Sequence, residues 1–349
     1  MPRPSKCLAA ALVALSFTAA PGAFAAETPT YVLTDLGTLG GSWSRPMQIN
    51  DRGMVTGETT RHERVHNALG IAFFEWRKRM IGLAPRLAGG GASVGLGVNA
   101  DGVVVGWEGL RGGGATMYPF MWSRDGYAHI GKGQGRANAI NDAGTITGTI
   151  GDFANSGHAF TWKDGVLTDL GTVGSATYSE GMAINAAGDI VGAVGHLAQE
   201  AGVMTYFDGV MTDWGTLGGN DAAATGVNAH REICGTMHTP LHLNPLPFHM
   251  KDGVVTRILG VPGMVSGDAA AINDAGEVVG TARIHGAEFQ IQHAYVWRDG
   301  RAVDLNDRIA EGGEGWVLER ATSINNRGEI VGHGTHLGES AAFKLTPLK

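Results

Sequence analysis

The chain has 349 residues, of which 56 are glycine and 12 are proline, and 43% of its residues are hydrophobic. Glycine is more than twice as frequent as in an average soluble protein, but the apolar content supplies a large core and excludes a disordered or collagen-like chain. Charged residues make up only 17% of the chain and the formal charge is -7. Because no basic patch stands out, we expect no nucleic-acid partner.

Residues 1–25 have the pattern of a secretory signal peptide. Arg3 and Lys6 provide a basic start, residues 8–20 are apolar, and Ala23-Phe24-Ala25 is a small-x-small cleavage motif. The apolar run is too short to span a bilayer. We therefore expect a protein that is secreted or periplasmic and has no membrane span.

The mature chain, residues 26–349, is predicted to form a single domain without disulfides. Removal of the signal peptide takes away Cys7 and leaves Cys234 as the only cysteine. An intramolecular disulfide is then impossible, so stability must come from packing.

A unit of about 46 residues repeats seven times along this domain. Its first motif is Ile-Asn-x-x-Gly-x-Val-Val-Gly, which predicts two strands joined by a tight turn. In the copies at Asn141 and Asn273, asparagine caps the turn, and Gly144 and Gly276 supply the positive φ that closes it. The seven asparagines are Asn50, Asn99, Asn141, Asn185, Asn228, Asn273 and Asn325.

A second motif, His-Ala-Phe-Thr-Trp-Lys-Asp-Gly at 158–165 and its copy at 293–300, predicts a third strand and an Asp-Gly turn. Aromatic residues two apart share one face of a strand, as do Phe160 and Trp162. His158, His293 and Trp297 are interpreted as structural in the same way. Degenerate copies are Phe74/Trp76, Phe120/Trp122, Met204/Tyr206, Phe248/Met250 and Phe343/Leu345. A third motif, Thr-Asp-Leu-Gly-Thr, forms the fourth strand, in which Asp35, Asp169, Asp213 and Asp304 are expected to make structural hydrogen bonds.

Four short strands in about 46 residues are typical of a β-propeller blade. The chain begins with a fourth strand at Tyr31–Leu36 and ends after a third strand at Ala341–Leu345. The two fragments complement each other and would complete the seventh blade, leaving no open sheet edge. The sequence therefore predicts an all-β, seven-bladed propeller closed by its N-terminal strand. A parallel β-helix is the alternative fold.

The three motifs together resemble the HAF repeat family of extracellular repeat proteins, over essentially the whole mature chain. This resemblance implies export and a repeat architecture but carries no reaction or ligand. Arg231 departs from the pattern by replacing a turn glycine, and Met250 and Leu345 replace the third-strand tryptophan. We expect those blades to be less regular.

The long loops after the second strand of each blade are where binding or catalytic residues are expected. These loops and strand ends collect eight histidines, which could act together as metal ligands, bases or polyanion contacts, or could simply belong to polar loops. Trp43, Trp107 and Trp316 could stack on sugars or cap blades. The histidines are His62, His66, His196, His238, His242, His285, His333 and His336.

The string His62-Glu63-Arg64-Val65-His66 matches the HExxH zinc pattern. On a helix, this spacing places two imidazoles on one face around zinc. Here it lies in a polar loop between two strands, carries Arg64 inside it and has no evident third ligand. We therefore expect no metal and no cofactor, with His62, Glu63 and His66 as the only weak metal candidate.

The sequence thus predicts an exported, monomeric binding or scaffold module that presents its loop face to a protein or glycan. The ligand-binding candidates on that face are His196, His238, His242, His285, His333, His336, Trp43 and Trp107. The alternative function is a polysaccharide lyase or hydrolase that uses a loop histidine as its base.

Overall fold

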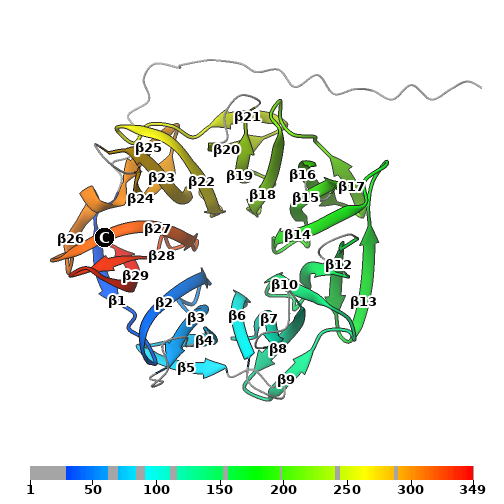
Figure 1. The fold of residues 1–349 in the computed structure, drawn as a ribbon, viewed down its shortest axis with the longest axis horizontal. Coiled ribbons are helices and arrows are strands. Elements are labelled where there is room, and N and C mark those ends of the chain that lie inside the picture. Colours follow the sequence, from blue (N-terminus) through cyan, green and yellow to red (C-terminus); the bar gives the residue numbers. More distant parts are fainter. Residues whose placement is uncertain are drawn as a thin grey trace, which may run out of the picture.

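The computed structural model describes residues 29–61, 70–83, 91–110, 116–151, 156–196, 199–239, 244–286 and 290–348. Seven sheets, antiparallel except for one parallel pair in the last, are arranged in a ring (Figure 1), which confirms the predicted seven-bladed β-propeller. The described residues contain no helix long and apolar enough to cross a membrane. The signal-peptide pattern at 1–25 lies outside the described residues.

In each blade the strands are ordered from the channel outward and are called A to D. Blades 1 to 3 consist of β2 (Gly40–Ile49), β3 (Val55–Arg61), β4 (Ile71–Trp76) and β5 (Arg79–Leu83); β6 (Gly91–Val98), β7 (Val104–Leu110), β8 (Met117–Ser123) and β9 (Gly126–His129); and β10 (Gly135–Ile140), β11 (Ile146–Ile150), β12 (His158–Lys163) and β13 (Val166–Gly171).

The next three blades follow the same order. They consist of β14 (Tyr178–Ile184), β15 (Ile190–His196), β16 (Gln199–Phe207) and β17 (Val210–Asp213); β18 (Asp221–Val227), β19 (Ile233–His238), β20 (Pro245–Lys251) and β21 (Val254–Arg257); and β22 (Met264–Ile272), β23 (Val278–His285), β24 (Gln290–Arg298) and β25 (Arg301–Asp304).

Blade 7 joins the two ends of the chain. It contains β27 (Trp316–Ile324), β28 (Ile330–His336) and β29 (Glu339–Pro347), and its strand D is β1 (Tyr31–Asp35). β1 runs antiparallel to β29, and its residues Tyr31 and Leu33 are buried in the core of this blade. The prediction that the N-terminal strand closes the ring is therefore confirmed.

Blade 7 has one strand more than the sequence predicts. A 3₁₀ turn, η1 (Leu305–Arg308), leads into β26 (Ile309–Glu311), which pairs in parallel with β1. The closing strand is thus hydrogen-bonded on both of its edges, which protects the outer edge of the blade.

The A–B turns form a closed ring of hydrogen bonds around the channel. In every copy, the asparagine Oδ1 accepts from the backbone N–H four residues later, and its Nδ2 donates to the backbone carbonyl of the next blade's asparagine. The seven donor-to-acceptor distances are 2.6 to 3.5 Å, and the bond from Asn325 to Asn50 closes the circle. Each asparagine therefore fixes its own turn and links two blades.

Arg231 keeps the turn geometry at the position where a glycine is expected. Its φ is 59°, and its N–H still donates to the Asn228 carbonyl at 3.2 Å. The guanidinium contacts the carboxylates of Asp189 and Asp208, at 2.9 and 2.8 Å. These ion pairs stabilise a left-handed conformation that an L-residue otherwise disfavours, so the turn itself is as regular as the others.

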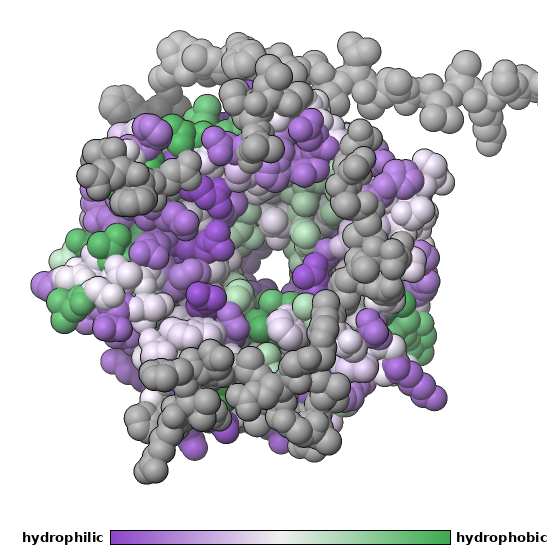
Figure 2. Space-filling model, viewed as in Figure 1, coloured by the Kyte–Doolittle hydropathy of each residue, from purple (hydrophilic) through white to green (hydrophobic). Residues whose placement is uncertain are grey.

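Each inner strand has a β-bulge shortly before its A–B turn, and the seven extra residues of these bulges line the channel. These residues are Met47, Leu96, Asn138, Met182, Thr225, Ala270 and Thr322. The cavity between them has a volume of about 180 Å³, and Figure 2 shows the opening at the centre of the ring. Since every lining residue lies at this repeated bulge or within two residues after it, the channel is mainly a product of the architecture.

Strand C of blade 1 differs from the predicted register by one residue. Phe73, and not Phe74, lies opposite Gly57 in the position that Phe160 holds opposite Gly148 in blade 3. Phe73 is fully buried against the core shared with blade 7, whereas Phe74 and Trp76 pack toward blade 2. A shift of one residue exchanges the two faces of a strand. Glu75 therefore occupies the place of the repeated tryptophan.

Candidate functional site

The histidines of the loop face lie apart, and most have a carboxylate partner within their own blade. Five such pairs occur at the ends of strands that meet this face, in blades 2, 3, 5, 6 and 7. They are His129–Glu108 at 2.5 Å, His158–Asp169 at 3.1 Å, His238–Asp221, His293–Asp304 at 2.5 Å and His336–Asp35 at 3.9 Å. Because each pair belongs to a different blade, they do not form one pocket.

The other predicted residues of this face are dispersed as well. His196 and His285 are exposed at the ends of β15 and β23, and Trp107 is half-buried in β7. Trp43 lies beside Arg45, whose Cζ is 4.9 Å from the ring centre. His62, Glu63, His66 and His242 lie outside the described residues. Within the described ranges, no three His, Cys, Asp or Glu side chains are placed to hold a metal ion.

His333 differs from the other histidines because it is half-buried beside two arginines, Arg320 and Arg45. Its Nδ1 has no hydrogen-bond partner among the described residues. Burial, with added repulsion from Arg320 and Arg45, lowers the pKa of His333 to about 4. The side chain of His333 is therefore neutral at neutral pH. The half-buried imidazole of His336 stacks on Trp316, with ring centres 4.8 Å apart.

The structural aspartates cap the ends of strand D. Asp35, Asp169 and Asp213 each accept from the backbone N–H two residues later at 2.7 Å, and Asp304 accepts from Asn306 at 2.9 Å. These contacts fix the connection to the next blade. The same carboxylates of Asp169 and Asp304 hold the histidines of the His-Ala-Phe motif.

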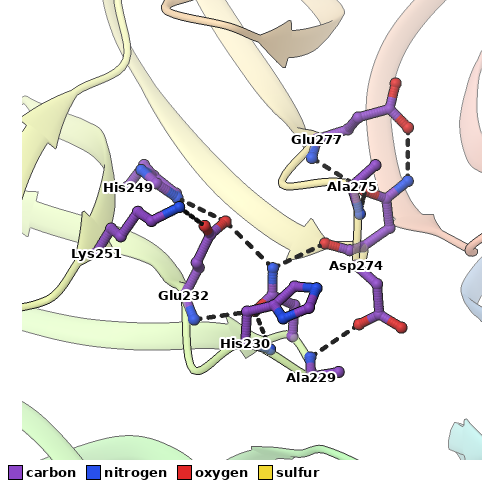
Figure 3. Close-up of polar contacts among 10 residues, drawn as sticks. Ala229, His230, Glu232, His249, Lys251, Asp274, Ala275 and Glu277 are labelled. Carbon is purple, nitrogen blue, oxygen red and sulfur yellow. Dashed lines mark hydrogen bonds and ion pairs between the residues drawn. The ribbon is translucent and has the colours of Figure 1, made fainter.

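On the opposite face, blades 4 to 7 bury a carboxylate four residues after the turn asparagine. Figure 3 shows Glu232, whose carboxylate accepts a hydrogen bond from Lys251 Nζ at 2.5 Å and lies 3.4 Å from His249 Nε2. Burial opposes ionisation of Glu232, but the hydrogen bonds from Lys251 and His249 outweigh it and lower its pKa. The equivalent carboxylates, each paired with arginine or lysine, are Asp189, Glu277 and Glu329.

A larger pocket lies at the outer rim between blades 1 and 2, and we call it the rim pocket. Its volume is about 620 Å³. One-residue displacement of strand C brings Phe74 and Trp76 to face Trp122 of blade 2, with the Phe74 and Trp122 ring centres 5.7 Å apart. Its lining is Phe74, Trp76, Ile81 and Trp122 together with Arg77, Arg79 and Arg124.

Two of the three arginines of the rim pocket lie against an aromatic ring. Arg77 Cζ lies 4.4 Å and Arg124 Cζ 5.6 Å from the Trp76 ring centre, both within cation–π distance. Arg77, Arg79 and Arg124 are exposed, and none of them forms an ion pair with a carboxylate in the part of the chain that the structure describes. The pocket thus offers oriented, uncompensated donors beside an apolar wall.

A second pocket of about 380 Å³ lies between blades 7 and 1, and we call it the closure pocket. Arg77 lines both pockets and so connects them. The closure pocket adds Lys78 and Lys344, and Lys344 Nζ is 2.9 Å from Glu329. Its acidic residues are Asp35 and Glu75.

Neither pocket was found from the sequence, which directed attention to the loop face. The one available signal is the string Trp-Arg-Lys-Arg at 76–79, which stands where four other blades carry an Asp-Gly turn. The sequence pattern matches Phe74 and Trp76 to Phe160 and Trp162, which places Trp76 in the core and conceals the unusual turn.

No family model and no curated protein matches the sequence. Among solved structures, the chain is similar to the acylaminoacyl peptidase of Pyrococcus horikoshii, with a TM-score of 0.54 and 12% identity over 89% of this chain and 52% of that one. It spans about half the length of that peptidase. The β-propeller domain of the Trilobed protease from Pyrococcus furiosus has a TM-score of 0.51 at 12% identity, over 92% of this chain and 98% of that one.

These likenesses show the fold alone, because the identity is 12% in both cases. The Trilobed protease domain is described as having an open velcro topology. In the present chain, by contrast, β1 pairs with β29 and joins the ends of the ring. The fold and its pockets therefore define a closed seven-bladed propeller with an aromatic and arginine-rich site on its rim.

Proposed function

We propose that this protein is an exported binding module that takes a glycan into the rim pocket. The observation that carries the proposal is the pocket itself: it has a volume of about 620 Å³ and is lined by Phe74, Trp76 and Trp122 together with arginines that form no ion pair among the described residues. Aromatic walls with a few oriented polar groups are typical of ligand sites, and indole faces suit the apolar faces of sugar rings.

The arrangement of the histidines also supports binding rather than catalysis. Acid–base chemistry on a glycan needs a base and its partners in one pocket. The five histidine–carboxylate pairs are distributed over five blades. Export is proposed from the pattern of residues 1–25, which precedes the propeller.

Binding to an array of neutral and acidic oligosaccharides tests this function, with Trp122→Ala as the variant that removes the pocket wall. We expect affinity to fall by about tenfold or more, the usual cost of losing an aromatic anchor. Trp162→Ala is the matched control, because Trp162 holds the same strand C position in blade 3, and it should bind like the wild type.

An array without any glycan bound would overturn the proposal. Equal losses in the two tryptophan variants would also overturn it, since the effect would then not come from the rim pocket. Binding confined to a parallel set of acidic peptides would replace the glycan by a protein partner.

A further inference from the structure

The C–D turn of blade 1 has a backbone conformation that its residues disfavour. In blades 3 to 6 the turn is Asp-Gly, and both residues have positive φ, as in Asp164 (50°) and Gly165 (86°). Such turns select Asp or Asn followed by glycine. Blade 1 places Arg77 (54°) and Lys78 (64°) in the same conformation. Left-handed backbone at a non-glycine residue is strained and is often found at functional sites.

Blade 1 also gives up a core position to hold this turn. Glu75 stands where blades 3 and 6 have tryptophan, opposite Val55, and it is only 5% exposed. Its Oε1 accepts from the Lys78 backbone N–H at 2.7 Å. Burial raises the pKa of Glu75, against the Lys78 hydrogen bond and the nearby Lys344 charge. In blade 1, the buried Glu75 carboxylate thus stands where other blades pack a tryptophan. Its hydrogen bond with Lys78 holds a turn that other blades form with a glycine.

The result of these substitutions is a local excess of positive charge on an acidic protein. The turn carries two cations where blades 3 to 6 carry one carboxylate, on a chain of net charge -7. Arg77 opens onto both the rim pocket and the closure pocket. Arg79 and Arg124 extend the positive charge along the rim pocket, and in the closure pocket Lys344 is paired with Glu329 at 2.9 Å.

We infer that the two pockets form one continuous site for an acidic glycan, whose carboxylate or sulfate groups pair with the arginines and lysines across the Arg77–Lys78 turn. The inference rests on the proposed function and names its ligand class. Guanidinium groups held over Trp76 are oriented for bidentate contact with such anions, and Trp122 packs against a sugar ring.

The experiment measures binding of a two-unit and a six-unit oligogalacturonate, and of neutral dextran, to the wild type and to Arg77→Asp/Lys78→Gly. The double variant restores the Asp-Gly turn. Its melting temperature should therefore be no lower than that of the wild type, and we expect it to be higher by up to about 3 °C. We expect its affinity for the six-unit acid to fall at least about 30-fold. A loss of binding in a more stable protein cannot be attributed to unfolding.

Ligand length and salt supply the remaining readouts. The six-unit acid should bind the wild type at least about tenfold more tightly than the two-unit acid, and this gain should vanish in the double variant. Added salt should weaken binding of the acid to the wild type. Asp164→Arg/Gly165→Lys, the same dipeptide placed in blade 3, is the control and should gain no affinity.

Equal binding of dextran and oligogalacturonate, or unchanged affinity in the double variant, would overturn the inference while leaving the proposed function intact. Equal affinity for the two lengths would reduce the site to a single pocket and would also overturn it. Absence of binding to every glycan would instead contradict the proposed function.

Discussion

The A–B turns at the channel and the C–D turns at the rim are subject to different structural constraints. The A–B turns are alike in all seven blades, and each asparagine bonds its own turn and the next blade. The C–D turns are Asp-Gly in blades 3 to 6, Arg77-Lys78 in blade 1 and Arg124-Asp125 in blade 2. The channel turns repeat because they build the ring, whereas the rim turns are free to differ.

The physical reason is the number of partners that each turn has. A buried asparagine that loses its side chain leaves unpaired groups in two blades at once. A rim turn touches solvent on one side, so a substitution there costs local backbone energy only. Ligand recognition is therefore expected where the repeat is broken at the rim, and four changes test that contrast.

Removal of the closing strand should have the largest effect. A chain that begins at Thr38 lacks β1, which exposes the partners of the buried Tyr31 and Leu33 and frees one edge of β29. We expect a loss of at least about 5 kcal/mol and failure to fold into soluble protein. Thermal denaturation and soluble yield measure it.

A circular permutant that carries residues 29–37 after residue 348 is the control. Tyr31 lies opposite Pro347 in the sheet, so a short linker can restore the pairing and with it the stability. An unchanged melting temperature on deletion would show that the inner ring alone holds the propeller closed.

The second change removes one bond of the inner ring. Asn141→Ala takes away the donor to the Asn185 carbonyl and the acceptor of the Thr145 N–H, both in a buried turn. We expect a loss of about 2–4 kcal/mol in urea denaturation. Asn220→Ala, at an exposed position, should cost less than about 0.5 kcal/mol. Equal costs in the two variants would show that the ring bond contributes nothing special to stability.

The third change concerns strand B of blade 7, where His333 is held neutral. Its pKa of about 4 lies below the usual value of an unfolded histidine. Protonation of this histidine therefore favours the unfolded chain. The free energy of unfolding keeps its full value above pH 6.5 and falls by on the order of 2 kcal/mol as the pH is lowered toward 4. His333→Gln should reduce the difference in unfolding free energy between pH 7 and pH 4.5.

His230→Gln is the control for this measurement, because His230 is exposed. It should keep the wild-type difference between the two pH values. The same pH dependence in the wild type and in His333→Gln would contradict the assignment to His333.

The smallest effect is expected when the blade 1 turn is moved to blade 3. Asp164→Arg/Gly165→Lys should cost about 1–2 kcal/mol in urea denaturation, because lysine would take the left-handed φ of Gly165. A Cβ at Gly165 meets no atom within 4 Å, so the cost is one of backbone strain. Asp164→Asn keeps the turn and should be neutral, and a neutral double variant would mean that the turn of blade 1 carries no strain.

Much of the architecture could be predicted from the repeat. Asparagine and glycine at fixed spacing require the same turn seven times, and the incomplete first and last units require each other. The ring of hydrogen bonds could not be predicted, because the Asn325 to Asn50 contact joins opposite ends of the sequence. The histidines were found, but their separation into pairs depends on strand register.

The rim pocket could not be predicted from the sequence. Alternation places Phe73 and Phe74 equally well in the core, and only packing against blade 7 selects Phe73. That choice turns Trp76 toward blade 2 and Glu75 toward blade 7, and so creates the site.

By itself, the sequence determined a glycine-rich, seven-fold β repeat closed by its N-terminal strand. The repeated turns and alternating strands are local properties, and local properties can be recognised in one unit and counted along the chain. The tertiary structure decided which side chains of neighbouring blades meet. The aromatic walls, unpaired arginines and strained turn come together only when blades 7, 1 and 2 pack side by side.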